Sequence, residues 1–183
     1  AGVANYHLYR DTTPYFTPAT AYQITTGTSY DDVGALGDIV VQHYYVVKSA
    51  CANGLKSDIS NRVGEYDWPL RAVSATNYSD ISMVFNNPAI PDAKSLATYI
   101  GSSVTKIMRY RPGTQTFQQY TVGIPITSFS ITTGEFLFVI TNNTAPASFP
   151  LVGNVPPEKS VSFALVSGTP GKYNYISLPL DRG

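Results

Sequence analysis

Residue types that usually carry enzyme chemistry are scarce in this chain. Its 183 residues include two histidines, His7 and His43, and a single cysteine, Cys51. The sequence contains no Gly-x-Ser-x-Gly, His-Glu-x-x-His or Walker motif and no Cys/His spacing typical of a metal site. We therefore predict no catalytic residues, no metal ion and no cofactor, and we expect that the protein is not an enzyme.

The acidic residues provide weak candidates for chemistry. Asp31, Asp32 and Asp38 share a turn-rich stretch where their oxygens could surround a hard cation such as Ca²⁺. Their spacing is not that of an EF-hand, so a solvated turn is the favoured interpretation. Glu135 and Glu158 are separate acids, which does not support the carboxylate pair of a glycosidase.

Aromatic rings offer a second kind of chemistry, because an exposed ring can stack on the face of a sugar. The candidates are Tyr9, Tyr15, Phe16, Tyr22, Tyr110 and Tyr120. Aromatic residues also pair across β-strands, and we expect most of these six to do so. Asn77 and Asn142 each begin an Asn-x-Ser/Thr pattern, which predicts N-glycosylation at these two residues.

Charge and composition narrow the classes of partner and the fold class. The chain carries 12 basic and 12 acidic residues, so no long-range field attracts nucleic acid or anionic lipid. No apolar stretch approaches the ~20 residues that span a bilayer, and we expect no membrane insertion. Fourteen Tyr, thirteen Pro and fourteen Gly are typical of short strands joined by tight turns, which predicts an all-β protein.

Few charges and many hydroxyl residues favour an extracellular or cell-surface protein. Cys51 is alone and cannot form an internal disulfide. Residues 1–20 lack the charged start and apolar core of a signal peptide, which suits a mature or cut N-terminus.

Hydrophobic periodicity predicts the elements. Alternating apolar and polar residues favour strands over 6–10, 21–24, 28–30, 39–50, 58–63, 79–85, 104–110, 117–122, 134–141, 147–152, 160–167 and 173–180. One helix is expected over 91–101, with Asp92 as its N-cap and Gly101 at the reversal.

The N-terminal part carries a resemblance to a known family. The run His7-Leu8-Tyr9-Arg10, then TTPYFTP, HYYVVKSACANG and SDISNRVGE, resembles the fibronectin type III family over roughly residues 4–66. The resemblance implies a fibronectin/immunoglobulin-like sandwich whose first two strands are missing. His43 occupies the position of the family's tyrosine corner, so either His43 provides that hydrogen bond or Tyr44 or Tyr45 does.

Two domains are expected. Residues 1–67 form the incomplete fibronectin-like sandwich, and residues 68–183 form a second β-rich domain with one short helix. Pro69 disfavours continuation of the last strand of the first domain, which places the junction near Trp68. The second unit is similar to a β-repeat of bacterial surface proteins.

Two stretches of that second unit are similar in sequence. The stretches 78–85 and 173–180 share the order of Tyr, Ile-Ser and large apolar residues. Two Tyr-rich strands of an all-β chain can match in this way by chance. Alternatively, the later strand begins the next copy of a repeat.

The missing strands and this similarity together suggest an assembly mechanism. A sheet that lacks strands exposes an apolar slot and unpaired backbone groups, which a strand from a neighbouring subunit can fill by donor-strand complementation. The predicted donor strand consists of Tyr173, Asn174, Tyr175, Ile176, Ser177, Leu178, Pro179 and Leu180. Residues 1–5 or 68–76 could serve as the donor instead.

We therefore predict an extracellular structural protein that assembles, with copies of itself or with neighbouring modules, into a surface filament or adhesive array. The alternative is an accessory or carbohydrate-binding tandem module of a larger secreted enzyme or surface-layer protein, with surface glycans as partners.

Overall fold

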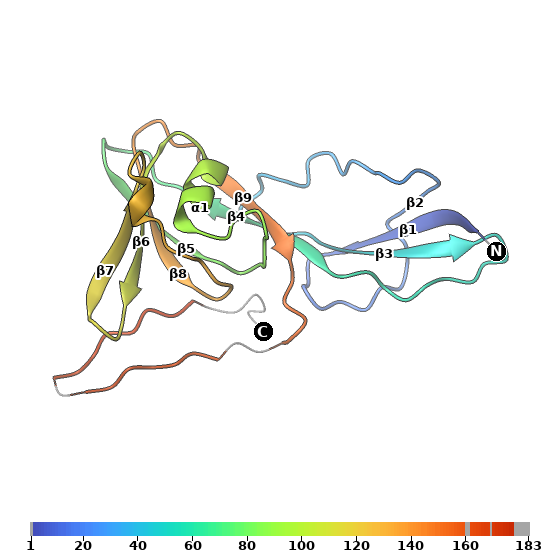
Figure 1. Cartoon of the computed structure of the whole chain (residues 1–183). Helices are drawn as coiled ribbons and strands as arrows, with labels where there is room; N and C mark the ends of the chain where they lie inside the picture. The colour runs from blue at the N-terminus through green and yellow to red at the C-terminus, as the bar shows by residue number, and fades with distance from the viewer. Residues whose placement is uncertain (1, 160–161, 169, 178–183) are drawn as a thin grey trace.

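The computed structural model describes residues 2–159, 162–168 and 170–177. Two antiparallel sheets and one short α-helix make up its regular structure (Figure 1), so the predicted all-β class is confirmed.

Sheet A contains five strands in the order β2-β1-β3-β4-β9. Their bounds are β1 (Val3–Asp11), β2 (Gln23–Thr25), β3 (Tyr44–Cys51), β4 (Val63–Pro69) and β9 (Ser148–Asn154). The longest pairing joins β1 to β3, which together extend away from the rest of the molecule (Figure 1).

Sheet B contains four strands in the order β5-β8-β6-β7. Their bounds are β5 (Asn77–Ser82), β6 (Val104–Arg111), β7 (Thr116–Thr121) and β8 (Phe136–Thr141). The predicted hairpin around Pro112-Gly113 is confirmed, because β6 and β7 pair on either side of it. A short 3-10 helix, η1 (Pro125–Thr127), follows β7.

The helix α1 (Ala93–Ile100) lies where the sequence predicts it. The Asp92 side chain accepts a hydrogen bond from the Ser95 amide at 2.7 Å, and Ser95 Oγ accepts one from the Asp92 amide at 3.1 Å. This capping box satisfies two backbone donors at the helix start. Gly101 ends the helix with φ of 123°, a backbone conformation that favours glycine.

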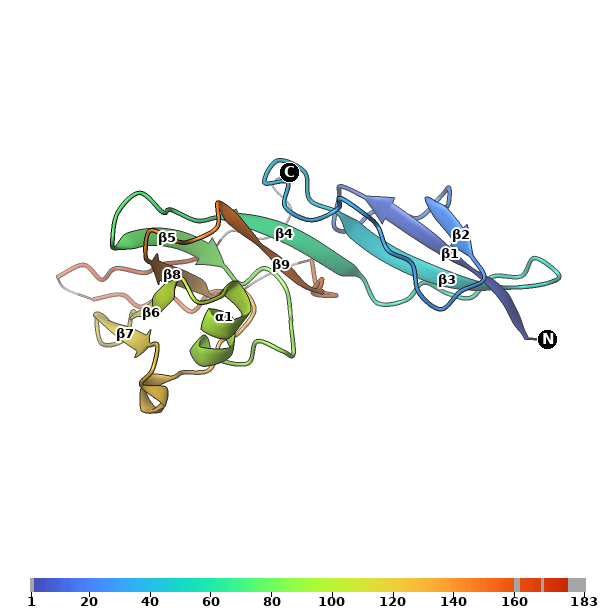
Figure 2. The same cartoon turned by 90° about the horizontal axis from the view of Figure 1, so that it is seen from above.

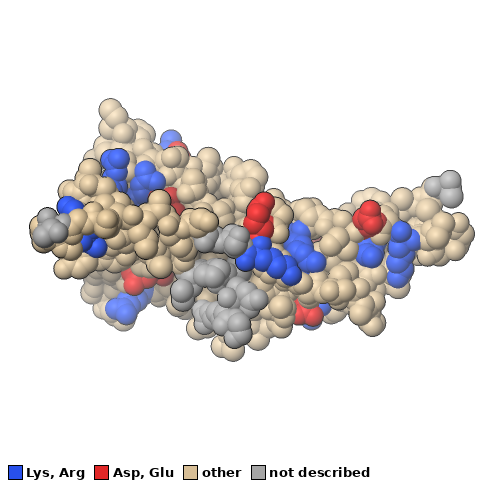
Figure 3. Space-filling view, turned by 90° about the horizontal axis from the view of Figure 1, so that it is seen from below, with Lys and Arg blue, Asp and Glu red and all other residues tan. Residues whose placement is uncertain are grey.

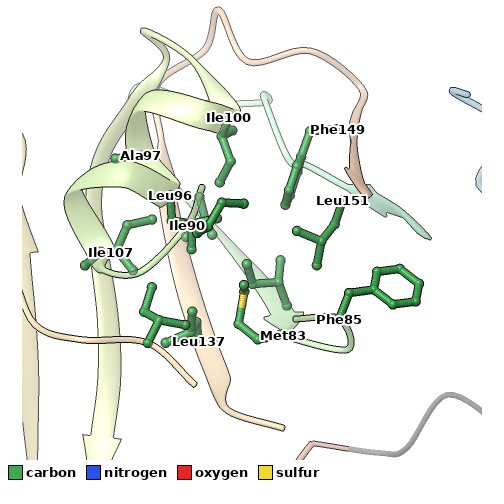
Figure 4. Close-up of a cluster of buried hydrophobic side chains, with 14 of the residues drawn as sticks. Met83, Phe85, Ile90, Leu96, Ala97, Ile100, Ile107, Leu137, Phe149 and Leu151 are labelled. Carbon is green, nitrogen blue, oxygen red and sulfur yellow. The ribbon is translucent and has the colours of Figure 1, made fainter. Parts of the chain in front are cut away.

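The main hydrophobic core lies between sheet B, α1 and the β4–β9 pair (Figures 2 and 4). Alternation along β9 places Phe149 and Leu151 in this core, where they are 3% and 0% exposed. From the helix, Leu96 and Ile100 point toward the same core (Figure 4). Sheet A therefore contributes only one of its ends to the core.

A pair of glycines allows Phe85 to pack directly on sheet A. Gly64 of β4 lies opposite Gly153 of β9. A Cβ atom on Gly64 would lie 2.6 Å from the Tyr44 ring, and one on Gly153 would lie 2.7 Å from Phe85 Cβ. Both distances are too short for real atoms, so these two positions require glycine for reasons of space.

The domain boundary expected between residues 67 and 68 falls inside β4. This strand pairs with β9 from Val63 to Pro69, so one sheet continues across the expected junction (Figure 2). Pro69 is compatible with the strand end because it stands at the last position of the ladder.

Some predicted strands differ from the observed ones. The stretch 39–50 is strand only from Tyr44, because residues 31–43 form a loop tied to β4 by side-chain contacts. Residues 162–167 and 173–177 have no regular secondary structure. No described strand pairs with either stretch, and the predicted strand residues Leu178, Pro179 and Leu180 lie outside the described residues.

Substitution of Gly153 by alanine tests the glycine pair. The added methyl group would also approach the Asn86 carbonyl oxygen to 2.9 Å, and backbone atoms cannot move aside cheaply. We expect G153A to lower the free energy of unfolding by about 1–3 kcal/mol and the melting temperature by several degrees. Thermal denaturation followed by circular dichroism provides the measurement.

G113A is the matched control, since nothing lies within 4 Å of a Cβ atom at Gly113. Equal melting temperatures for wild type, G153A and G113A would contradict the packing argument.

Candidate functional site

Two buried carboxyl groups lie side by side on one surface of β4. Glu65 and Asp67 are two residues apart in the strand, so their side chains project from the same face. Their exposed fractions are 2% and 1%. Charged residues are rarely buried to this extent unless they are paired, which makes this pair the most unusual polar feature of the sheet.

The loop formed by residues 31–43 covers both carboxyl groups and is held by them. Glu65 Oε1 accepts a hydrogen bond from the His43 amide at 2.6 Å and lies 3.2 Å from His43 Nδ1. Asp67 Oδ2 accepts one from the Gly37 amide at 2.9 Å. The His43 backbone amide thus holds Glu65, and the His43 ring contacts the Glu65 side chain rather than the backbone, so this is not the side-chain-to-backbone bond of a tyrosine corner.

We infer that Glu65 and Asp67 share a proton between their two remaining oxygens. Glu65 Oε2 and Asp67 Oδ1 are buried and have no hydrogen-bond partner among the described residues. Burial, reinforced by the neighbouring Asp67, raises the pKa of Glu65 to about 8. Glu65 is therefore protonated at neutral pH, and its hydroxyl can donate to the Asp67 carboxylate.

The pair fits a structural role better than a reaction. Neither carboxyl group has a solvent-facing surface that a substrate could reach. The sequence reasoning missed both residues, although two acids alternating with Tyr66 and Trp68 in an otherwise apolar strand are a usable signal.

Asp32 belongs to a second polar cluster on the same loop. Its carboxylate accepts hydrogen bonds from Arg10 at 2.9 Å, from the Tyr22 hydroxyl at 2.9 Å and from the Tyr45 hydroxyl at 2.8 Å. Burial acts to raise the pKa of Asp32, but these hydrogen bonds outweigh it and the pKa falls below its usual value. Protein donors thus occupy the oxygens that a cation would need.

No group of three or more His, Cys, Asp or Glu side chains within the described part of the chain is arranged to hold a metal ion.

Most of the candidate sugar-stacking rings serve in packing. Tyr9 and Tyr120 are 3% and 4% exposed, and Tyr15 and Phe16 pack against the main core. Tyr22 lies under the Arg10 guanidinium, 3.9 Å from it.

A shallow groove of about 270 Å³ lies elsewhere, on sheet A. Its lining is rich in tyrosine and hydroxyl side chains and consists of Tyr6, Leu8, Thr25, Gly27, Thr28, Ser29, Tyr30 and Val47.

The two predicted glycosylation sites differ in accessibility. Asn77 is 4% exposed, and its amide nitrogen donates to the carbonyl oxygens of Ser74, Thr141 and Asn142. Its nitrogen is therefore not free to carry a sugar in the folded chain, which argues against this prediction. Asn142 is half-buried, and its oxygen accepts hydrogen bonds from Thr144.

The described part of the predicted donor strand, Tyr173–Ser177, lies on the outer face of sheet B. There Tyr175 joins a cluster of aromatic rings on β6, β7 and β8. Its ring centroid lies 5.1 Å from Tyr110, 5.6 Å from Phe138, 5.7 Å from Phe136 and 6.5 Å from Phe117. Ring pairs at these distances attract each other beyond simple burial.

Polar contacts fix both ends of this stretch. The Tyr173 amide donates to Gln115 Oε1 at 2.9 Å, and Gln115 Nε2 donates back to the Tyr173 carbonyl at 3.2 Å. Ser177 Oγ donates to the Gly134 carbonyl at 2.5 Å. Tyr175 and Ser177 therefore face sheet B, and Tyr175 and Ile176 are still 45% and 48% exposed.

The Glu65 pKa generates a test of the shared proton. Between pH of about 4.5 and about 8 the unfolded chain loses the Glu65 proton while the folded chain keeps it. The free energy of unfolding should therefore fall as pH rises through this window, by at most about 1.4 kcal/mol per pH unit. Above this window both states are ionised and the loss is complete.

E65Q should remove most of that slope, because the carboxamide accepts from His43, donates to Asp67 and does not titrate. Urea unfolding at several pH values between 5 and 8 measures the slope. E158Q, at an exposed position, should keep the wild-type slope. An E65Q slope equal to that of wild type would refute the shared proton.

Charged side chains of both signs are scattered in small groups over the face shown in Figure 3. Among the described residues, no helix is long and apolar enough to cross a membrane.

Comparison with known protein families finds no match to this chain. Comparisons with curated proteins and with solved structures find no match either. The resemblance to the fibronectin type III family therefore stays a prediction.

Proposed function

We propose that this chain is a structural module of an extracellular filament or adhesive array, joined to a like module through Tyr173–Ser177. The observation that carries the proposal is the state of this segment. One side of it is seated on sheet B through Tyr175 and Ser177, while its backbone pairs with no described strand and Ile176 points into solvent.

This state is that of a strand held ready for pairing. Its side chains already alternate between two faces, as in a strand, and its contacts with Gln115 and Gly134 fix its direction. Pairing would add backbone hydrogen bonds and bury Ile176, whose exposed fraction is 48%.

The rest of the chain is consistent with a structural role. The most buried acids, Glu65 and Asp67, hold a loop and have no access for a substrate. The net charge of zero provides no field that would gather a charged ligand. Low charge and abundant hydroxyl residues favour the extracellular location.

Self-association of the full chain tests this proposal. Wild type should form concentration-dependent oligomers in sedimentation velocity experiments, and I176D should weaken the association at least tenfold because it places a charge in the new interface. I124D is the matched control, since Ile124 is 49% exposed and lies outside the segment.

A wild-type chain that stays monomeric at about millimolar concentration would refute joining between copies of this chain. Equal weakening by I176D and I124D would refute the role of the segment.

A carbohydrate-binding role is the second candidate, and the groove on sheet A favours it. Tyr6 and Tyr30 line this groove together with the hydroxyls of Thr25, Thr28 and Ser29, which combines ring faces with hydrogen-bond groups. Its volume of about 270 Å³ suits one small sugar unit.

A glycan array provides the test of the groove. We expect binding that is lost in Y30A, at a position that is 41% exposed, and retained in Y78A, a 58% exposed tyrosine on sheet B. An array without binding would remove this candidate.

A further inference from the structure

We infer that residues 161–177 repeat the β4–β5 unit, residues 66–82, and that Asn174 and Ile176 complete the sheet of a second module of the same kind. The inference rests on the proposed function, because it identifies the partner of the same segment. It is carried by a sequence register, a repeated hydrogen-bond bridge and the direction of each side chain.

The register is constant over the whole unit. When each residue is compared with the one 95 positions later, as in 79 to 174, four identical pairs appear without a gap: Leu70 with Leu165, Tyr78 with Tyr173, Ile81 with Ile176, and Ser82 with Ser177. Trp68 corresponds to Phe163, another large aromatic residue. The matches thus lie at the β4-like and β5-like ends of the unit, whereas positions 71–77 and 166–172 share no identical residue.

In the same 95-residue register, each unit contains a hydrogen bond between a polar side chain and the backbone eight residues earlier. In the first unit the Arg71 amide donates to Ser79 Oγ at 3.0 Å. At the corresponding positions, the Val166 amide donates to Asn174 Oδ1 at 2.9 Å, and Asn174 Nδ2 donates to the Val166 carbonyl at 3.0 Å. Both units therefore use a polar side chain at the same position to hold the backbone eight residues earlier.

Side-chain direction agrees with this correspondence. In β5, Ile81 is 1% exposed because it faces the core, whereas Asp80 faces outward. In the second unit Ile176 should likewise face a core and Tyr175 should face outward. Ile176 instead points into solvent, at 48% exposed, because the described chain has no sheet on that side of it.

The outward position of Tyr175 supplies the contact between modules. Its ring packs on Phe136, Phe138, Phe117 and Tyr110 of the first module's sheet B. Tyr175 can keep this contact while Asn174 and Ile176, on the other face, enter the core of the second module. In Figure 1 the described stretches 162–168 and 170–177 lie beneath sheet B, and the hydrogen bonds between Val166 and Asn174 place them side by side.

The first module defines the partner strand and its register. In β5, Ser79 lies opposite Val139 and Ile81 opposite Leu137 of β8. Asn174 and Ile176 should therefore lie opposite the corresponding residues of a β8-like strand. Both edges of β8 in this chain are already occupied, by β5 and β6. The partner must consequently be a module whose β5 position is vacant or vacated.

A chain extended by its own strands tests the inference. Gly183 corresponds to Pro88 in the 95-residue register, so residues 89–155 can be appended directly after Gly183 without a linker. The extended chain then contains β6- to β9-like strands for the second unit. Hydrogen exchange measured by mass spectrometry compares residues 173–177 in the natural and extended chains.

We expect exchange of these amides to slow at least about 100-fold in the extended chain, to a rate close to that of β5. Insertion of one serine between Tyr175 and Ile176 turns Ile176 to the opposite face and should abolish the protection. Unchanged exchange in the extended chain, or equal protection with the inserted serine, would overturn the inference.

The two proposals fail separately. Protection in the extended chain without self-association of the natural chain refutes only assembly between copies. Self-association that depends on Ile176, without slower amide exchange at residues 173–177 in the extended chain, supports the contact between modules and refutes the repeat register.

Discussion

The arrangement of this molecule depends on the pairing of β4 with β9. The two strands pair from Val63 to Pro69, so β4, the next strand after β3 in the chain, becomes part of the wall of the main core. At Gly64 and Gly153 the wall has no side chains, and Phe85 packs against the bare backbone. Most of β1, β2 and β3 extends away from sheet B (Figure 1), and Tyr44 at the start of β3 is the residue of these strands that belongs to the main core.

Because side chains alternate along β4, its two faces have different structural roles. One face places Tyr66 and Trp68 against the core, and the other buries Glu65 and Asp67 beneath the loop of residues 31–43. Two carboxylates in one dry site would repel each other strongly, and retention of a proton by one of them removes that cost. Glu65 and Asp67 therefore hold the loop of residues 31–43 in place through hydrogen bonds from the Gly37 and His43 amides.

The outer face of sheet B is contacted by the segment Tyr173–Ser177 of the same chain. Large exposed apolar patches are uncommon on soluble proteins. Here Tyr175 of the same chain packs on the aromatic rings of the outer face of sheet B. Because one strand presents its odd and even residues to opposite sides, this segment can also offer Ile176 to a second sheet. In the assembly that we propose, the sheet of a second, like module covers Ile176.

Local patterns determined much of this structure. The all-β class, the capped helix α1 and the hairpin around Pro112-Gly113 follow from contacts between near neighbours, and the sequence alone predicts them. It also singled out the stretch that begins at Tyr173 and its likeness to β5. The burial of Glu65 and Asp67, the continuation of sheet A across residue 67 and the outward direction of Ile176 were decided only by the tertiary structure. Each of these depends on which distant segment lies alongside, and a periodic pattern specifies which face is apolar without specifying what will cover it.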